Sequence, residues 1–134
     1  MNQREKYIFL AALMEGEGSF YISNKFNNRM IITNTSHTMI KWLHENFKGY
    51  VYERKSRSNP NWRTKFEWIL ERGQVLEICE NILPFMLCKK EHTQVMIEFR
   101  KTYIFKYGHH VPQEITDLRN QCYEKLKYLN STVI

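Results

Sequence analysis

Two periods of apolar residues divide the chain into helical and extended segments. A helical period covers Glu5–Glu15, after which Gly16 and Gly18 can adopt the backbone angles that end a helix. Strict alternation follows without a spacer in Ser19–Lys25 and Arg29–Thr35, and the short "FNN" between these two runs indicates a hairpin. The N-terminal segment therefore predicts a helix that passes directly into a pair of antiparallel strands.

The next segment has a second helix followed by a second strand pair. Ser36 is a good N-cap for a helix that ends before Gly49, and its apolar positions recur at helical spacing: Met39, Ile40, Leu43 and Phe47. Tyr50–Lys55 and Lys65–Glu71 alternate as strands across the polar stretch Ser56–Thr64. The two strand pairs together predict a four-stranded antiparallel sheet.

Three helices complete the chain, at Gln74–Met86, Lys89–Lys106 and Pro112–Leu129. The last one has an apolar stripe of Ile115, Leu118, Cys122, Leu126 and Leu129. The predicted fold class is α+β, in the order αββαββα with additional C-terminal helices on one face of the sheet. With 134 residues and 43% hydrophobic content, the whole chain, 1–134, is expected to be one domain.

Period two assigns the strand residues to two faces of the sheet. Toward the helices we expect Phe20, Ile22, Met30, Ile32, Val51, Phe66, Trp68 and Leu70. On the opposite, open face we expect Tyr21, Ser23, Lys25, Arg29, Thr33, Thr35, Tyr52, Arg54, Lys65 and Glu67, with Ile69 in the same alternation. Solvation alone can account for such a face. The four cationic and two tyrosine side chains among these ten favour a surface that contacts phosphates and base edges in a DNA major groove.

The overall charge agrees with a polyanionic partner but does not identify one. Lys and Arg number 20 against 14 acids, which gives a formal net charge of +6. The three cysteines, Cys79, Cys88 and Cys122, are widely spaced among apolar residues, which indicates reduced core thiols rather than a zinc site. The N-terminal apolar run is too short to span a membrane and is followed by acids, so we expect an intracellular protein of the cytoplasm or an organelle matrix.

One short segment carries a resemblance to a known family. "LAALMEGEG", Leu10–Gly18, resembles the signature of the LAGLIDADG homing endonucleases, with Ala12 in the first glycine position and Glu15 and Glu17 in the two aspartate positions. Three further segments are similar to the family: the strand "GSFYIS", the stretch "LPFMLCKKE" and the closing helix "CYEKLKYLN". The motif occurs once, so the chain is identified as a single-motif member, a class that acts as homodimers.

The resemblance implies a catalytic site at the end of the first helix. Glu17 matches the family's catalytic, metal-binding acid, and the main-chain carbonyl of Gly16 would provide a second metal contact. Lys89 matches the basic catalytic residue, with Lys90 as the alternative one residue along. Mg²⁺ is the expected metal because hard oxygen ligands hold it and it neutralises charge during phosphodiester hydrolysis. Mn²⁺ is expected to substitute for it, and Ca²⁺ to support binding without cleavage.

The same helix is the expected dimer interface. Ala11, Ala12 and Gly16 have small side chains that allow close helix approach, either within one subunit or across a two-fold axis, and the single motif favours the axis. Glu15 is expected at this interface, bonded to backbone or side-chain donors that hold the junction together. By resemblance Ser36 and Lys41 are candidate water-positioning residues, although Ser36 alone is explained as a helix N-cap.

Other chemistries find less support in the sequence. The five histidines lack the spacing of a metal or His-Asn-His nuclease site and are interpreted as structural or surface groups. Ser19 has no evident His and Asp partners for a catalytic triad. The three tryptophans are most simply interpreted as core or edge aromatics: Trp42, Trp62 and Trp68. Trp62, in the Ser56–Thr64 loop, could reach DNA.

The expected function is that of a homodimeric, site-specific double-strand DNA endonuclease of a mobile element, leaving 3′ overhangs at a long near-palindromic site. The chain begins with Met1 and ends without the terminal Asn of an intein, so an intron-encoded or free-standing product is expected. Two alternatives stay open. One is an RNA splicing maturase or a non-cleaving DNA-binding protein on the same fold, and the other is a protein-interaction domain whose basic face is incidental.

Overall fold

The structure is a computed structural model that describes residues 1–55 and 63–132. Helix α1 (Gln3–Glu17) leads into strands β1 (Gly18–Ile22) and β2 (Asn28–Asn34), followed by α2 (His37–Phe47), β3 (Tyr50–Arg54) and β4 (Lys65–Glu71). The chain continues through α3 (Gln74–Ile82), a 3₁₀ helix η1 (Leu83–Phe85), α4 (Lys90–Lys101) and α5 (Gln113–Ser131). The predicted fold class and order of elements are confirmed.

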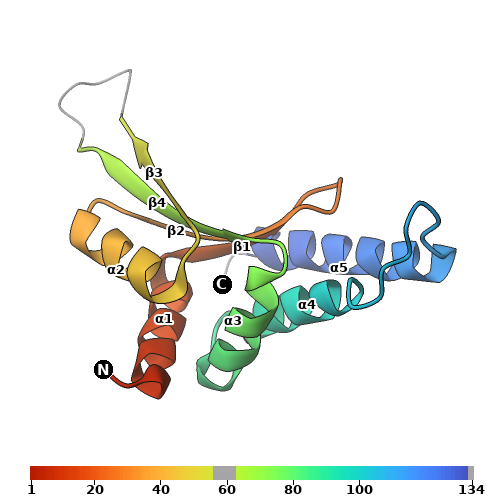
Figure 1. Cartoon of the computed structure of the whole chain (residues 1–134), viewed down its shortest axis with the longest axis horizontal. Coiled ribbons are helices and arrows are strands. Elements are labelled where there is room, and N and C mark those ends of the chain that lie inside the picture. The colour runs from red at the N-terminus through yellow and green to blue at the C-terminus, as the bar shows by residue number, and fades with distance from the viewer. Residues whose placement is uncertain (56–62, 133–134) are drawn as a thin grey trace.

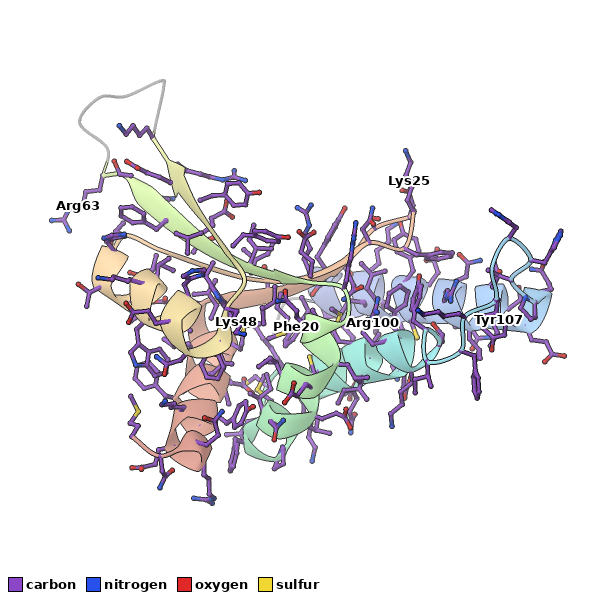
Figure 2. The ribbon with its side chains drawn as sticks, viewed as in Figure 1. Phe20, Lys25, Lys48, Arg63, Arg100 and Tyr107 are labelled. Carbon is purple, nitrogen blue, oxygen red and sulfur yellow. The ribbon has the colours of Figure 1, made fainter. Side chains whose placement is uncertain are left out.

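The sheet is antiparallel with strand order β1-β2-β4-β3, so β2 and β4 pair at its centre. Figure 1 shows the helices on one side of the sheet, while its other side is open. The core between the two layers contains residues from distant parts of the chain, including Leu10 and Met14 of α1, Phe20 of β1 and Trp68 of β4, all at most 1% exposed. Figure 2 shows Phe20 in this interior position, between the sheet and the helices.

Helix α1 ends for a different reason than the one we predicted. Neither Gly16 nor Gly18 has a positive φ, and the helix continues through Gly16 to Glu17. Gly18 has extended angles, φ −88° and ψ 160°, and its amide donates to the Met14 carbonyl. A Cβ at residue 18 would lie 2.7 Å from Met14 Cα. Gly18 is therefore required because β1 leaves the helix in close contact with its last turn, not because the backbone needs a left-handed conformation.

Strand β1 and helix α3 end earlier than predicted, for local reasons. Strand β1 ends at Ile22 because the Ser23 hydroxyl accepts the amides of Lys25 (3.2 Å) and Asn27 (3.1 Å), which closes a turn. Helix α3 ends at Ile82 and a 3₁₀ turn containing Pro84 follows, since proline lacks the amide that a continuing helix needs.

Helix α4 ends at Lys101 rather than at residue 106. The Thr102 hydroxyl donates to the Phe99 carbonyl (2.6 Å), and the Arg119 guanidinium donates to both the hydroxyl (3.0 Å) and the carbonyl (3.1 Å) of Thr102. Arg119 also lies over the Tyr103 ring, 3.7 Å from its centroid. This cation at the C-terminus of α4 complements the helix dipole and its unpaired carbonyls.

Three expectations about burial were wrong. Leu118 is exposed and Arg119 takes the buried position in the stripe of α5, because the guanidinium reaches the end of α4. Val51 is exposed because β3 is the edge strand. Cys88 is exposed, whereas Cys79 and Cys122 are buried thiols as expected, and burial raises the pKa of Cys122 to about 11. Trp68 is a core residue, Trp42 is half-buried, and Trp62 lies outside the described residues.

Candidate active site and nucleic-acid interface

Glu17 is the last residue of α1, and its side chain is exposed beside the start of β1. One carboxylate oxygen, Oε2, accepts a hydrogen bond of 2.6 Å from Nδ2 of Asn34, the last residue of β2. The Asn34 side-chain oxygen in turn accepts the Ser36 amide at 2.7 Å, which fixes the orientation of the amide group. Glu17 is thus held in place by the sheet while it keeps an open oxygen at the protein surface.

Glu15 has a different environment, although it is only two residues away. Its carboxylate accepts the main-chain amides of Leu87, Cys88 (2.9 Å) and Lys89 (3.2 Å). These amides precede the first turn of α4, where a helix has unpaired donors and the positive end of its dipole. Glu15 therefore acts as an N-terminal cap of α4, and this bonding to backbone donors at a junction agrees with the expectation for it.

Lys89 makes the reciprocal contact, from the start of α4 to the end of α1. Its ammonium donates to the carbonyls of Met14 (2.9 Å) and Gly18 (2.5 Å) at the C-terminal end of α1. Burial lowers the pKa of Lys89, while the neighbouring Glu15 opposes that shift. Each helix thus supplies a charged side chain of the correct sign to the end of the other. Lys90, the alternative in the adjacent register, is exposed.

The small residues of α1 fall into two groups, one buried in the core and one exposed on the outer face of the helix. Ala11 is 1% exposed and packs in the core of its own chain, so it has no surface left for a partner, and its assignment to a dimer interface was wrong. Ala12 is exposed, and a Cβ added at Gly16 would have no atom within 4 Å. Ala12 and Gly16 therefore leave a smooth surface on α1. The placement of Ala12, Gly16 and Glu15 in a dimer interface stays a prediction.

Of the two candidate water-positioning residues, Ser36 immediately precedes α2 and Lys41 lies on that helix. Ser36 caps that helix, since its hydroxyl accepts the Met39 amide at 3.3 Å. Lys41 is exposed, and its ammonium lies 3.9 Å from the Glu45 carboxylate one turn along. A role in positioning water stays a prediction for both.

The open face of the sheet contains most of the residues predicted there. Tyr21, Arg29, Thr33, Tyr52, Arg54, Lys65 and Glu67 are on strands and alternate as expected. Ser23 and Lys25 belong instead to the connection between β1 and β2, and Thr35 follows the end of β2. Lys25 projects from the tip of its loop, away from the helices, and Arg63 lies at the opposite end of the sheet (Figure 2). Whether these residues contact DNA stays a prediction.

The centre of this face is less polar than the alternation indicates. Ile31 of β2 pairs with Ile69 of β4, which in turn pairs with Tyr50 of β3. Ile69 is buried even though it points to the open side, because these neighbours cover it. Charged residues flank this apolar row: the Arg29–Glu71 pair (3.1 Å) is on one side, and the Arg54–Glu67 pair is on the other.

The structure adds three residues that the sequence analysis missed. Asn34 positions Glu17, Glu71 pairs with Arg29, and Arg63 adds a cation near the start of β4. Period two already places Glu71 on the open face, so that residue could have been found. The contact of Asn34 with Glu17 depends on how β2 passes the end of α1, which no local pattern encodes.

Two features are absent from the part of the chain that the structure describes. Within 1–55 and 63–132, no three side chains of His, Cys, Asp or Glu gather closely enough to hold a metal ion. No helix in that part of the chain is long and apolar enough to cross a membrane. His92 is half-buried on α4, with its ring 6.4 Å from that of Phe20.

The arrangement of a helix, two strand pairs and an open sheet face is the fold of the homing endonucleases, as comparison with solved structures shows. The homing endonuclease I-CvuI, in complex with its target in the presence of Ca, matches with a TM-score of 0.76 and 13% identity, over 97% of this chain and 85% of that one. The archaeal intron-encoded homing endonuclease I-Vdi141I, complexed with DNA, matches with a TM-score of 0.77 and 15% identity, over 99% and 89%.

A second structure of I-CvuI, in the presence of Mg with a DNA that is not cleaved, matches with a TM-score of 0.71 and 11% identity, over 97% of this chain and 85% of that one. No protein-family model and no curated protein sequence matches the chain. The resemblance found in the sequence is confirmed at the level of the fold, which three structures share over most of the chain.

Proposed function

We propose that this chain is a homodimeric, Mg²⁺-dependent, site-specific DNA endonuclease that leaves 3′ overhangs. The observation that carries the proposal is the environment of Glu17, an exposed carboxylate at the end of a helix whose outer face is small and smooth. The likeness of the fold to homing endonucleases in DNA complexes supports it. Two copies in contact through Ala12 and Gly16 would bring two such carboxylates together at a two-fold axis.

The groups at the end of α1 fit a divalent cation with a preference for oxygen. Glu17 offers a carboxylate oxygen, and the last carbonyls of a helix lack intrahelical donors, among them that of Gly16. When bound, Mg²⁺ would neutralise phosphate charge and favour deprotonation of an attacking water. Asn34 holds the Glu17 carboxylate in position, and the Lys89 ammonium adds a fixed positive charge within the same helix end.

Two surfaces support the remaining parts of the proposal. Between α1 and α2 a groove of about 310 Å³ is lined by Phe9, Met39 and Trp42, beside the small residues of α1, which would extend a subunit interface. The open sheet face, with cations at both its ends, would lie in a DNA major groove.

A cleavage assay tests the catalytic role of Glu17. The DNA is a plasmid library with randomised inserts, or, where the reading frame interrupts a gene, the rejoined flanks of that gene. With Mg²⁺ or Mn²⁺ the wild type should cut both strands, Glu17→Gln should lose at least about a hundredfold in rate, and Ca²⁺ should support binding alone. Glu124→Gln, an exposed acid on α5, is the matched control and should cut normally.

The assay separates the rival functions. Specific DNA binding by the wild type without nicking in any metal would overturn the endonuclease proposal and leave a DNA-binding protein. Preference for a structured intron RNA over DNA would indicate a maturase. If the basic face is incidental, affinity for DNA will hardly change with salt, whereas phosphate contacts make the affinity fall steeply as salt rises.

A further inference from the structure

Two arginines on the open face of the sheet are bound in the same way. Arg29 of β2 donates from Nε to Oε2 of Glu71 at 3.1 Å, and Arg54 of β3 forms an ion pair through Nε with Oε1 of Glu67. Both glutamates belong to β4, the strand that lies between the two arginines in the sheet. In both pairs a carboxylate on β4 holds the Nε side of a guanidinium from a neighbouring strand, although Arg29 lies directly opposite Glu71 whereas Arg54 lies opposite Lys65 and reaches Glu67 diagonally.

Burial distinguishes the two members of each pair. The side chain of Glu67 is 11% exposed against 71% for Arg54, and that of Glu71 is 29% exposed against 45% for Arg29. Thr33 contributes a further contact, since its hydroxyl lies 3.4 Å from Oε2 of Glu67. The carboxylates thus lie low on the sheet while the guanidinium groups lie above them.

An arginine bound through Nε keeps its two terminal nitrogens for another partner. Those two parallel donors match a ligand with two adjacent acceptors. Among the base edges of the major groove, only guanine presents two acceptors, O6 and N7, because adenine pairs its N7 with a donor and cytosine presents a donor. Fixing the guanidinium in advance reduces the side-chain entropy that is lost on binding, and it sets the direction of the fork.

From this geometry, and resting on the proposed DNA-binding function, we infer that Arg29 and Arg54 each read a guanine in the major groove, with Glu71 and Glu67 as positioning residues. Arg29 lies opposite Glu71 and Arg54 lies opposite Lys65, so the two arginines start six residues apart along β4, on its two sides, and lean toward carboxylates that are four residues apart. Four to six residues span about 13–20 Å along a strand, or roughly four to six base-pair steps of B-DNA. Each half-site should therefore contain two required guanines, on either strand, about four to six base pairs apart.

Lys65 provides a matched contrast on the same face. It is the register partner of Arg54, is exposed, and makes no ion pair among the residues that the structure describes. A lysine of this kind would contact phosphate as a point charge and add affinity without base preference. Lys65→Ala should weaken binding evenly across sequences and lower the salt dependence by about one phosphate contact.

The test is selection of DNA sites by the full-length protein from a randomised library, followed by sequencing of the bound fraction. The wild type should enrich sites with two guanines per half-site. Arg54→Lys should reduce the preference for guanine about tenfold at one position only, and Arg29→Lys should do the same at the other. Glu67→Gln and Glu71→Gln should each lower the preference at the position read by their own arginine, while the remaining positions stay as in the wild type.

Different results would overturn different parts. If Arg29→Lys and Arg54→Lys keep both guanine preferences, or lose base preference equally at all positions, the inference is wrong although DNA binding stands. If the wild type selects a site but never cuts it, the endonuclease proposal falls and guanine reading can stand. If the wild type enriches no sequence, both fall. Because Glu67 is nearly buried, its variant is checked by circular dichroism, and the more exposed Glu71→Gln gives the same test without that risk.

Discussion

His92 on α4 is a half-buried histidine whose surroundings bear on how stability depends on pH. Its Nδ1 is buried and has no hydrogen-bond partner within the described part of the chain. Burial lowers the pKa of His92, and Lys89 lowers it further, while the Leu129 main chain and the carboxylates of Glu91 and Glu15 act in the opposite direction. The net shift is downward because removing a cation from water outweighs these contacts.

We predict that acid destabilises the protein partly through this histidine. With a folded pKa below 6.5, the unfolded chain binds more protons between the two values, so stability is lost as the pH falls through 6.5 toward the folded pKa. The urea midpoint of the wild type should drop between pH 7 and pH 5, and His92→Gln should drop less. His109→Gln, at an exposed histidine, is the control and should follow the wild type. Equal drops in all three proteins would contradict the prediction.

At the scale of elements, the fold depends on charged side chains that connect helix ends across long sequence separations. Glu15 reaches the start of α4, Lys89 reaches the end of α1, and Arg119 reaches the end of α4. Each contact satisfies main-chain groups that a helix cannot satisfy itself. The first two contacts fix the end of α1 against the start of α4, and thereby fix the position of Glu17.

We predict that Glu15→Gln lowers the free energy of unfolding by about 1–2 kcal/mol, the range expected for loss of a charged helix cap. Three amides would keep only a neutral acceptor, so the effect arises at α4 even though the substitution is in α1. Urea unfolding measures it, with Glu124→Gln as the control for loss of one negative charge. A change no larger than that of the control would show that the cap contributes little.

Local pattern was sufficient for most elements and insufficient for the contacts between them. The strands and the α2 cap at Ser36 follow from alternation and capping, which extend over only a few residues. The end of α4 was misjudged because Arg119, seventeen positions beyond Thr102, closes it. In the candidate site, Glu17 and Lys89 were predicted from two segments that resemble the family, whereas the contact of Asn34 with Glu17 depends on β2 lying beside α1.

For the whole molecule, the question is whether two copies meet through α1. Gly16 in the last turn of α1 and Gly18, the residue that follows the helix, have opposite surroundings, which makes the question testable. A side chain at Gly16 would point into open space, while one at Gly18 would collide with Met14. A larger side chain at residue 16 is therefore expected to leave the fold of the isolated chain intact. It would interfere only with a second molecule that occupies the same space.

We predict that Gly16→Leu gives a chain at least as stable as the wild type but unable to dimerise. Leucine has a better helix propensity than glycine by about 0.5–1 kcal/mol, whereas its bulk would separate two helices in close contact. Sedimentation equilibrium at micromolar concentration should give a dimer for the wild type and a monomer for Gly16→Leu. Asn120→Leu, on the exposed face of α5, should remain dimeric. Gly18→Ala should instead destabilise the chain itself, because its Cβ would lie 2.7 Å from Met14 Cα. A dimer that survives Gly16→Leu would mean that the copies meet elsewhere, and the two Glu17 carboxylates would then have no common site.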